Sequence, residues 1–171
     1  MKKTSLKYGG IGGLILGTLF AIAFAFLSTD NPNYKLSEVI GYVTMILSLS
    51  VVYFGIRNFR DDDLDGSISF GKAFTTGLAI SAVAALIFAA FDTLYVTVLN
   101  PEFFADYMDW QLETMTTDGA SQVEIQKVTD QFEMFLGPMG AAINGVVMFL
   151  TVFLIGLVVS LISSVILKKT D

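Results

Sequence analysis

Residues 139–167 read MGAAINGVVMFLTVFLIGLVVSLISSVIL, and no Asp, Glu, Lys or Arg interrupts them. A helix needs about 20 apolar residues to cross the hydrocarbon core of a bilayer, and this stretch exceeds that length. Gly137-Pro138 precedes it and Lys168-Lys169 follows it, which are typical start and stop signals. The stretch therefore predicts a transmembrane helix and sets the fold class of the chain.

Three further apolar stretches come before it, and the composition agrees with a membrane protein. Of the 171 residues 54% are hydrophobic and only 15% are charged, which is too apolar for a soluble domain of this size. We predict an all-α membrane protein, a bundle of four transmembrane helices forming one membrane domain over residues 1–171. The expected spans are residues 6–27, 36–56, 74–99 and 139–167.

The basic residues predict how the spans are oriented, because Lys and Arg translocate poorly and stay in the cytoplasm. In a model with four spans, only Lys35 and Lys127 fall on the outer side. We therefore expect both termini in the cytoplasm and an address in the inner membrane. The basic residues on the inner side are Lys2, Lys3, Lys7, Arg57, Arg60, Lys72, Lys168 and Lys169.

The first span also resembles a signal peptide, since Ala23-Phe24-Ala25 could be a cleavage site after Lys2, Lys3 and an apolar run. The apolar run continues through Leu27, past that site, and it carries an array of glycines that a discarded peptide would not need. We expect the span to be retained.

Residues 100–138, between the third and fourth spans, hold eight acidic residues and one lysine. Their apolar residues repeat at helical spacing in two pieces, with a turn at Asp118-Gly119 and a capping box from Ser121 to Glu124. We expect an extracytoplasmic amphipathic helical hairpin whose first helix is capped by Asn100. Its rings are interpreted as an interfacial belt, with a ligand surface as the alternative; they are Phe103, Phe104, Tyr107 and Trp110.

Small residues recur at every fourth position in three spans. Lipid tails give helices no hydrophobic reason to pair, so such stripes serve close approach of backbones. We expect packing within the bundle, with contact between copies of the chain as the alternative. The clearest positions are Gly9, Gly13, Gly17, Gly77, Ser81, Gly156 and Ser160.

Asp92 is an ionisable group inside the third span, about eight residues or roughly 12 Å from its outer end. An unpaired carboxylate there costs about 2.5 to 3.5 kcal/mol, so it needs a partner, a proton or water. Asn144 lies roughly 9 Å deep from the same face and can meet it, and Tyr42 and Tyr95 are further donors. We favour a polar clasp between helices over a proton or cation relay, which usually needs several polar groups in series. Apart from Asp92, the one acid in a predicted span is Glu38, at the very start of the second span.

The loop after the second span resembles a calcium-binding loop only in part. Asp61, Asp63, Asp65 and Gly66 match its first half, but Lys72 stands where the bidentate Glu should be. A solvated acidic turn is the favoured interpretation, and no metal site is predicted.

The absence of Cys and His excludes thiolate nucleophiles, imidazole bases and the usual zinc, copper and haem ligands. No set of base, nucleophile and oxyanion donor converges in the spans, so we expect no enzyme. We also expect no cofactor and no nucleic-acid partner.

Two loop motifs resemble a known family. GIRNFRD at residues 55–61 and GSISFGKAF at residues 66–74, followed by Asn100-Pro101-Glu102-Phe103, are similar to the domain of unknown function 4199 family. That resemblance covers nearly the whole chain and implies a small inner-membrane protein with four spans, of Bacteroidetes-type bacteria, without an assigned activity. It carries over no catalytic residue.

Together these patterns predict a non-enzymatic accessory or interaction protein. The bilayer surrounds it, and a second copy or another membrane protein is expected to bind its outer acidic hairpin. The alternative is a small ion- or proton-coupled permeation unit that uses Asp92.

Overall fold

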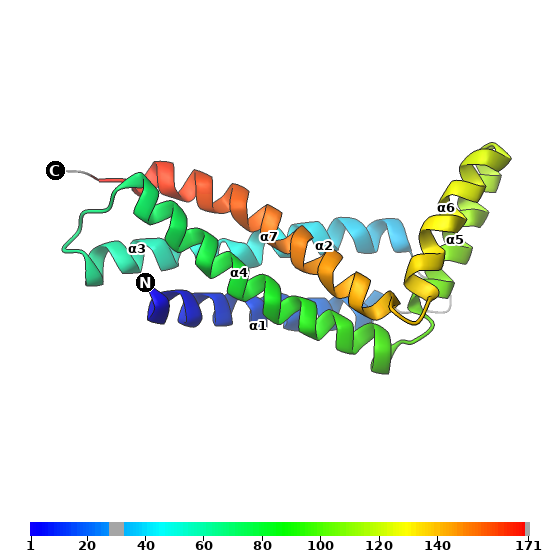
Figure 1. The fold of residues 1–171 in the computed structure, drawn as a ribbon, viewed down its shortest axis with the longest axis horizontal. Coiled ribbons are helices and arrows are strands. Elements are labelled where there is room, and N and C mark those ends of the chain that lie inside the picture. The colour runs from blue at the N-terminus through cyan, green and yellow to red at the C-terminus, as the bar shows by residue number, and fades with distance from the viewer. Residues whose placement is uncertain (28–32, 170–171) are drawn as a thin grey trace. The chain divides into compact units, whose positions relative to one another are not determined.

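The computed structural model describes residues 1–27 and 33–169, and within these ranges the chain forms helices and no strand. Figure 1 labels these helices and colours them in chain order. The elements are α1 (Lys2–Leu27), α2 (Tyr34–Leu49), α3 (Val51–Asp63), α4 (Phe70–Leu94), the π-helical segment η1 (Tyr95–Leu99), α5 (Phe103–Thr117), α6 (Gln122–Leu136) and α7 (Gly140–Leu167).

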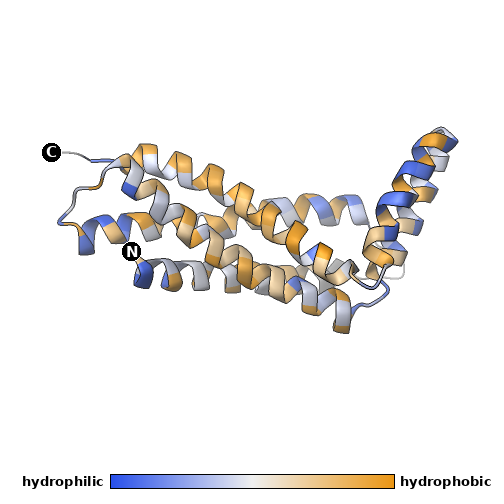
Figure 2. Ribbon diagram, in the orientation of Figure 1, coloured by the Kyte–Doolittle hydropathy of each residue, from blue (hydrophilic) through white to orange (hydrophobic). Residues whose placement is uncertain are grey.

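Four helical stretches are long and apolar enough to cross a membrane, as predicted. They cover Lys2–Ala23, Tyr34–Asp63, Phe70–Leu99 and Gly140–Leu167. The second and third extend beyond the predicted spans because the polar residues at their ends continue the helix into the flanking segments. Figure 2 shows hydrophilic residues concentrated on α5, α6 and the end of α3, whereas α7 is hydrophobic along most of its length.

The second span is interrupted at Ser50, which lies between α2 and α3. The Ser50 hydroxyl donates to the Leu47 carbonyl at 2.6 Å, and its backbone stays in the right-handed helical region. A serine that bonds back to the preceding turn often bends a helix. The sequence carries no Gly or Pro here, so the break was not predicted.

The chain divides into two compact units, each described separately below. Unit 1 comprises Met1–Ala89 and Met148–Asp171, and unit 2 comprises Ala90–Val147.

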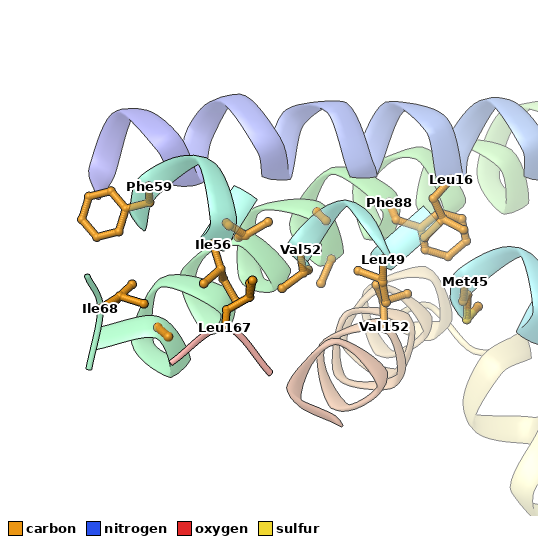
Figure 3. Close-up of a cluster of buried hydrophobic side chains, with 14 residues drawn as sticks. Leu16, Met45, Leu49, Val52, Ile56, Phe59, Ile68, Phe88, Val152 and Leu167 are labelled. Atoms are coloured by element: carbon orange, nitrogen blue, oxygen red, sulfur yellow. The ribbon is translucent and has the colours of Figure 1, made fainter. Parts of the chain in front are cut away.

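The centre of unit 1 is a cluster of buried apolar side chains from α1 to α4 and α7 (Figure 3). Phe88 is fully buried, and its ring meets that of Phe20 edge to face, with centroids 5.2 Å apart. Leu16, Leu49 and Val152 are each at most 1% exposed. In a bilayer such contacts stabilise the bundle through close packing rather than through removal from water.

Small residues bring α1 close to α4. A Cβ atom added at Gly9 would lie 2.5 Å from the Val83 Cβ, and one at Gly13 would lie 2.8 Å from the Ile87 Cβ. Both positions therefore require glycine. Gly17, the next member of the stripe, is also buried.

The contact between α4 and α7 in unit 1 is reciprocal. A Cβ at Gly77 would lie 2.7 Å from the Ser160 Cβ, and one at Gly156 would lie 2.5 Å from the Ser81 Cβ. The Ser81 and Ser160 hydroxyl oxygens are 3.2 Å apart, and each hydroxyl donates to the carbonyl four residues earlier. These small residues pack helices of the same chain.

One end of unit 1 is closed by contacts between distant segments. Ile68 and Lys169 exchange both backbone hydrogen bonds, at 2.9 and 3.0 Å, in an isolated antiparallel bridge. The Arg60 guanidinium donates to the Leu167 carbonyl at the end of α7, at 3.3 Å. The Thr4 hydroxyl of α1 lies 3.5 Å from an Asp63 carboxylate oxygen. The start of α1 and the end of α7 therefore lie at the same end of this unit.

In unit 2, α5 and α6 pack against each other through their apolar stripes. The Phe104 and Phe135 rings stack with centroids 5.2 Å apart, and the Tyr107 and Phe132 rings lie 5.7 Å apart. The turn between the helices contains Gly119 at φ 79°, a backbone conformation that favours glycine. The predicted capping box of Ser121 and Glu124 is present.

The predicted cap at Asn100 is wrong. Helix α5 begins at Phe103 with Glu102 as its N-cap residue, and no side chain caps it. Asn100 instead ends η1, because Pro101 cannot continue the helical hydrogen bonds.

Candidate functional site

The candidate site lies in unit 2 and is built around Asp92, near the end of α4. The helix that carries it is long and apolar enough to cross a membrane, and Asp92 is only 4% exposed. A carboxyl group so placed must be satisfied inside the protein.

Asn144 provides the partner. Its side-chain nitrogen, near the start of α7, donates to the Asp92 carboxylate at 2.5 Å, and Asn144 is 2% exposed. Counting the helical rise from Asn100 to Asp92 and from Pro138 to Asn144 puts the two residues at comparable depth, and this predicted that they can meet.

The neighbouring residues explain how the two helices come so close. A Cβ at Gly145 would lie 2.8 Å from the Thr93 hydroxyl oxygen, so any larger residue would displace that hydroxyl. Asp92 and Thr93 thus face Asn144 and Gly145 as two adjacent contacts. Thr93 and Gly145 were not singled out from the sequence, although a glycine directly after a buried Asn was an available signal.

The segment that follows Asp92 is irregular. η1 contains a hydrogen bond from the Asn100 backbone N–H to the Tyr95 carbonyl at 2.8 Å, five residues apart. Such π-helical turns are rare and occur often at functional sites. The Asn100 side-chain nitrogen also donates to the Tyr95 hydroxyl at 3.2 Å, and Tyr95 is 8% exposed.

The four residues of the predicted polar site therefore differ in their surroundings. Asp92 and Asn144 meet directly, and Tyr95 lies one turn further along with its hydroxyl bonded to Asn100. Tyr42 belongs to α2 in unit 1 and is 56% exposed. The part of Tyr42 in this site stays a prediction.

A carboxyl and a carboxamide can do two things chemically. Together they can form a hydrogen bond that fixes one helix against another, and the carboxyl can take up and release one proton. Within residues 1–27 and 33–169, the hydrogen-bond partner of the Asp92 carboxyl is the Asn144 amide, which carries no charge.

The acidic residues at the end of α3 and in the loop after it form ion pairs and hydrogen bonds with neighbouring residues. Asp61 accepts from Arg60 at 2.7 Å and lies 3.5 Å from Arg57, while Asn58 donates to Asp62. Asp65 and Gly66 both have positive φ, which makes this segment a tight turn. Among the residues that the structure describes, no group of three or more acids, His or Cys is arranged to hold a metal ion.

The pair of helices α5 and α6 presents the largest charged surface of unit 2. All of its acidic residues are exposed, and so is Lys127. Hydrogen bonds from the Ser121 side chain and backbone hold the pKa of the Glu124 carboxyl below its usual value. The acidic residues are Glu102, Asp106, Asp109, Glu113, Asp118, Glu124, Asp130 and Glu133.

Two buried hydroxyls also escaped the sequence analysis. Ser5 and Ser48 are 5% and 2% exposed, and neither hydroxyl has a hydrogen-bond partner in the described part of the chain. Serine is common in membrane helices, so no sequence signal distinguishes these two.

Comparison with known proteins gives one match. No curated protein and no solved structure is significantly similar to the chain. A family described as a protein of unknown function, DUF4199, matches residues 7–169. The match covers nearly the whole chain, including α1 to α7 and both loop motifs, and the chain therefore belongs to the DUF4199 family.

Proposed function

We propose that this protein is a non-enzymatic accessory protein of the cytoplasmic (inner) membrane, with four spans and both termini in the cytoplasm. Helices α5 and α6 then lie outside and bind a basic surface of another membrane protein or of a second copy. The excess of Lys and Arg in the segments at the other ends of the spans supports this orientation.

The observation that carries the proposal is that α5 and α6 pack through their aromatic rings and leave their carboxylates exposed. Their rings pack against one another, as in the stacked pair Phe104 and Phe135. Neither helix has a fully buried residue, and the carboxylates all point to the exposed surface. The result is an ordered acidic surface, which suits electrostatic attraction to a basic partner.

The residues near the membrane give no support for catalysis. The chain lacks Cys and His, and the buried acid Asp92 is bonded to an amide rather than to a nucleophile or a base. An interaction role needs none of these groups.

Site-specific photo-crosslinking in native membranes tests the proposal. A photoreactive residue at Glu113 or Asp130, both exposed, should trap one defined partner that mass spectrometry identifies, and high salt should reduce the yield. The exposed loop residue Ser69 is the control position and should not trap that partner.

A charge test complements it. Glu113→Gln with Asp130→Asn should lower the crosslinking yield from a neighbouring position, whereas Asp62→Asn with Asp65→Asn removes the same charge elsewhere and should not. No discrete product at either position, or the same loss with both double variants, would reject the acidic surface as the binding site.

Asp92 supports a second candidate function, proton- or cation-coupled permeation. Its carboxyl is buried beside a π-helical turn and is bonded only to a neutral amide among the described residues. In proteoliposomes, Asp92→Asn should then abolish ion flux while abundance and helix packing stay intact. If neither the wild type nor Asp92→Asn conducts ions and the variant is less stable, permeation is rejected and Asp92 has only the structural role of a clasp.

A further inference from the structure

Lysines from three distant segments gather at one end of unit 1. The start of α1 is held near the end of α3 by Thr4 and Asp63, and the end of α7 is paired with Ile68 just before α4. All of these lysines are exposed. We call them the lysine end: Lys2, Lys3, Lys72, Lys168 and Lys169.

The arginines at this end are already engaged. The Arg60 side chain contacts Asp61 at 2.7 Å and also donates to the Leu167 carbonyl at the end of α7. Arg57 lies 3.5 Å from the same carboxylate. The last carbonyls of a helix attract cations, and at the end of α7 Arg60 takes this place. The lysines therefore remain available to bind another anion.

The lysines have no such partners. Across residues 1–27 and 33–169, no carboxylate forms an ion pair with any of the five. Two of the nearby acids are engaged with neutral groups, because Asp62 accepts from Asn58 and Asp63 accepts from Thr4. Asp62, Asp63 and Asp65 keep their negative charges and offset three of the five lysine charges, so among the described residues this end keeps a net positive charge.

The backbone under these lysines is fixed. The Lys168 N–H donates to the Ser164 carbonyl at 3.0 Å, and Lys169 shares two hydrogen bonds with Ile68. Lys72 lies within α4, with its ammonium 5.9 Å from the centre of the Phe59 ring. The charges are thus held at a defined level of the bundle.

Apolar surface leads directly to these charges. The last turns of α7 expose large aliphatic side chains just before the two lysines, with Val165 53% and Ile166 63% exposed. One turn earlier, Leu161 and Ile162 are 43% and 55% exposed. An apolar strip that ends in cations matches a molecule with an acyl chain and an anionic head.

We propose that the lysine end binds the phosphate of an anionic phospholipid, whose acyl chain lies along the exposed strip of α7. The proposal rests on insertion of α7 in a bilayer and not on the accessory role of α5 and α6. A free phosphate would use the lysines but not the strip, and this difference separates the two sources. Basic segments at a membrane surface attract anionic lipid in this way.

Native mass spectrometry of the full chain in detergent measures the binding. Phosphatidylglycerol should bind with a lower Kd than phosphatidylcholine of the same acyl chains. Because each lysine near a lipid surface contributes about five-fold in affinity, Lys168→Gln with Lys169→Gln should raise the phosphatidylglycerol Kd by about 25-fold. Its Kd for phosphatidylcholine should not change.

The matched control neutralises two lysines that do not belong to the lysine end. Lys35→Gln with Lys127→Gln changes the net charge equally and should leave both Kd values as in the wild type. Circular dichroism melts confirm that each variant is folded, and both changes are at exposed residues.

Three outcomes would overturn the proposal. The first is equal affinity of the wild type for the two lipids. The second is an equal loss with both double variants, which would show a general effect of charge. The third is displacement of phosphatidylglycerol by inorganic phosphate at equal concentration, which would show that the acyl strip contributes nothing.

Discussion

Removing the Asn144 amide should destabilise the bundle more than removing an exposed amide does. In Asn144→Leu the Asp92 carboxyl, 4% exposed, loses the hydrogen bond of 2.5 Å that satisfies it. An unsatisfied buried acceptor costs about 1 to 3 kcal/mol, and measured hydrogen bonds in membrane bundles reach about 1.7 kcal/mol. We therefore expect a loss of about 1 to 2 kcal/mol in the free energy of unfolding.

The chain contains its own control for this measurement. Asn58 and Asp62 form a second Asn and Asp pair, at the end of α3, in which Asp62 is exposed. Water replaces the lost partner there, so Asn58→Leu should change the free energy of unfolding by less than about 0.5 kcal/mol. Reversible unfolding in mixed detergent micelles, followed by circular dichroism, compares the two variants.

The double variant tests whether Asp92 and Asn144 depend on each other. Asp92→Leu with Asn144→Leu removes both polar groups, so no buried group is left without a partner and most of the loss should be recovered. An equal effect of Asn144→Leu and Asn58→Leu would contradict the clasp. So would a double variant whose loss equals the sum of the two single losses.

Two further predictions concern packing and pH. Gly156→Ala places a Cβ 2.5 Å from the Ser81 Cβ and should cost about 1 to 3 kcal/mol, whereas Gly41→Ala meets no atom within 4 Å and should be neutral or slightly stabilising in the same unfolding assay. The pKa of Glu124 is lowered in the folded protein by Ser121, so its contribution to α6 is present above the unfolded pKa of this carboxyl and is lost as pH falls through the folded pKa. Hydrogen exchange in the first turn of α6 should therefore accelerate at acid pH relative to neutral, after correction for the intrinsic rate, and Glu124→Gln should remove that change.

The spans could be predicted because hydropathy and length are local properties of the sequence. Residues 139–167 carry no charge, and the structure forms α7 from Gly140 to Leu167. Element boundaries were less accurate where polar residues continue a helix, as at the end of α3, where Asp63 is still helical.

Counting helical rise from the span ends predicted that Asp92 and Asn144 can meet, and the structure places their side chains in contact. The same counting could not find Thr93 and Gly145, because their contact is a close approach of the Thr93 hydroxyl to the glycine, which depth does not reveal. Tyr42 was grouped with the site on depth alone, and its part there stays a prediction, because depth does not say which way a side chain on a helix points.

Long-range backbone contacts left no trace in the local pattern. The bridge between Ile68 and Lys169 and the bond from Arg60 to the Leu167 carbonyl join segments about one hundred residues apart. The break at Ser50 was hidden for another reason, since serine is common within membrane helices and rarely ends one. Asn100 looked like a cap from its neighbours, yet its backbone completes η1.

In the proposed topology, four spans place α5 and α6 on the side of the membrane opposite the termini and the loop after α3. The chain has no Cys, so single cysteines at Glu113 and at Ser69 can be labelled with a maleimide that does not cross membranes. In intact cells we expect labelling of Glu113→Cys, and labelling of Ser69→Cys only after the membrane is permeabilised. Labelling of both cysteines from the same side would contradict it.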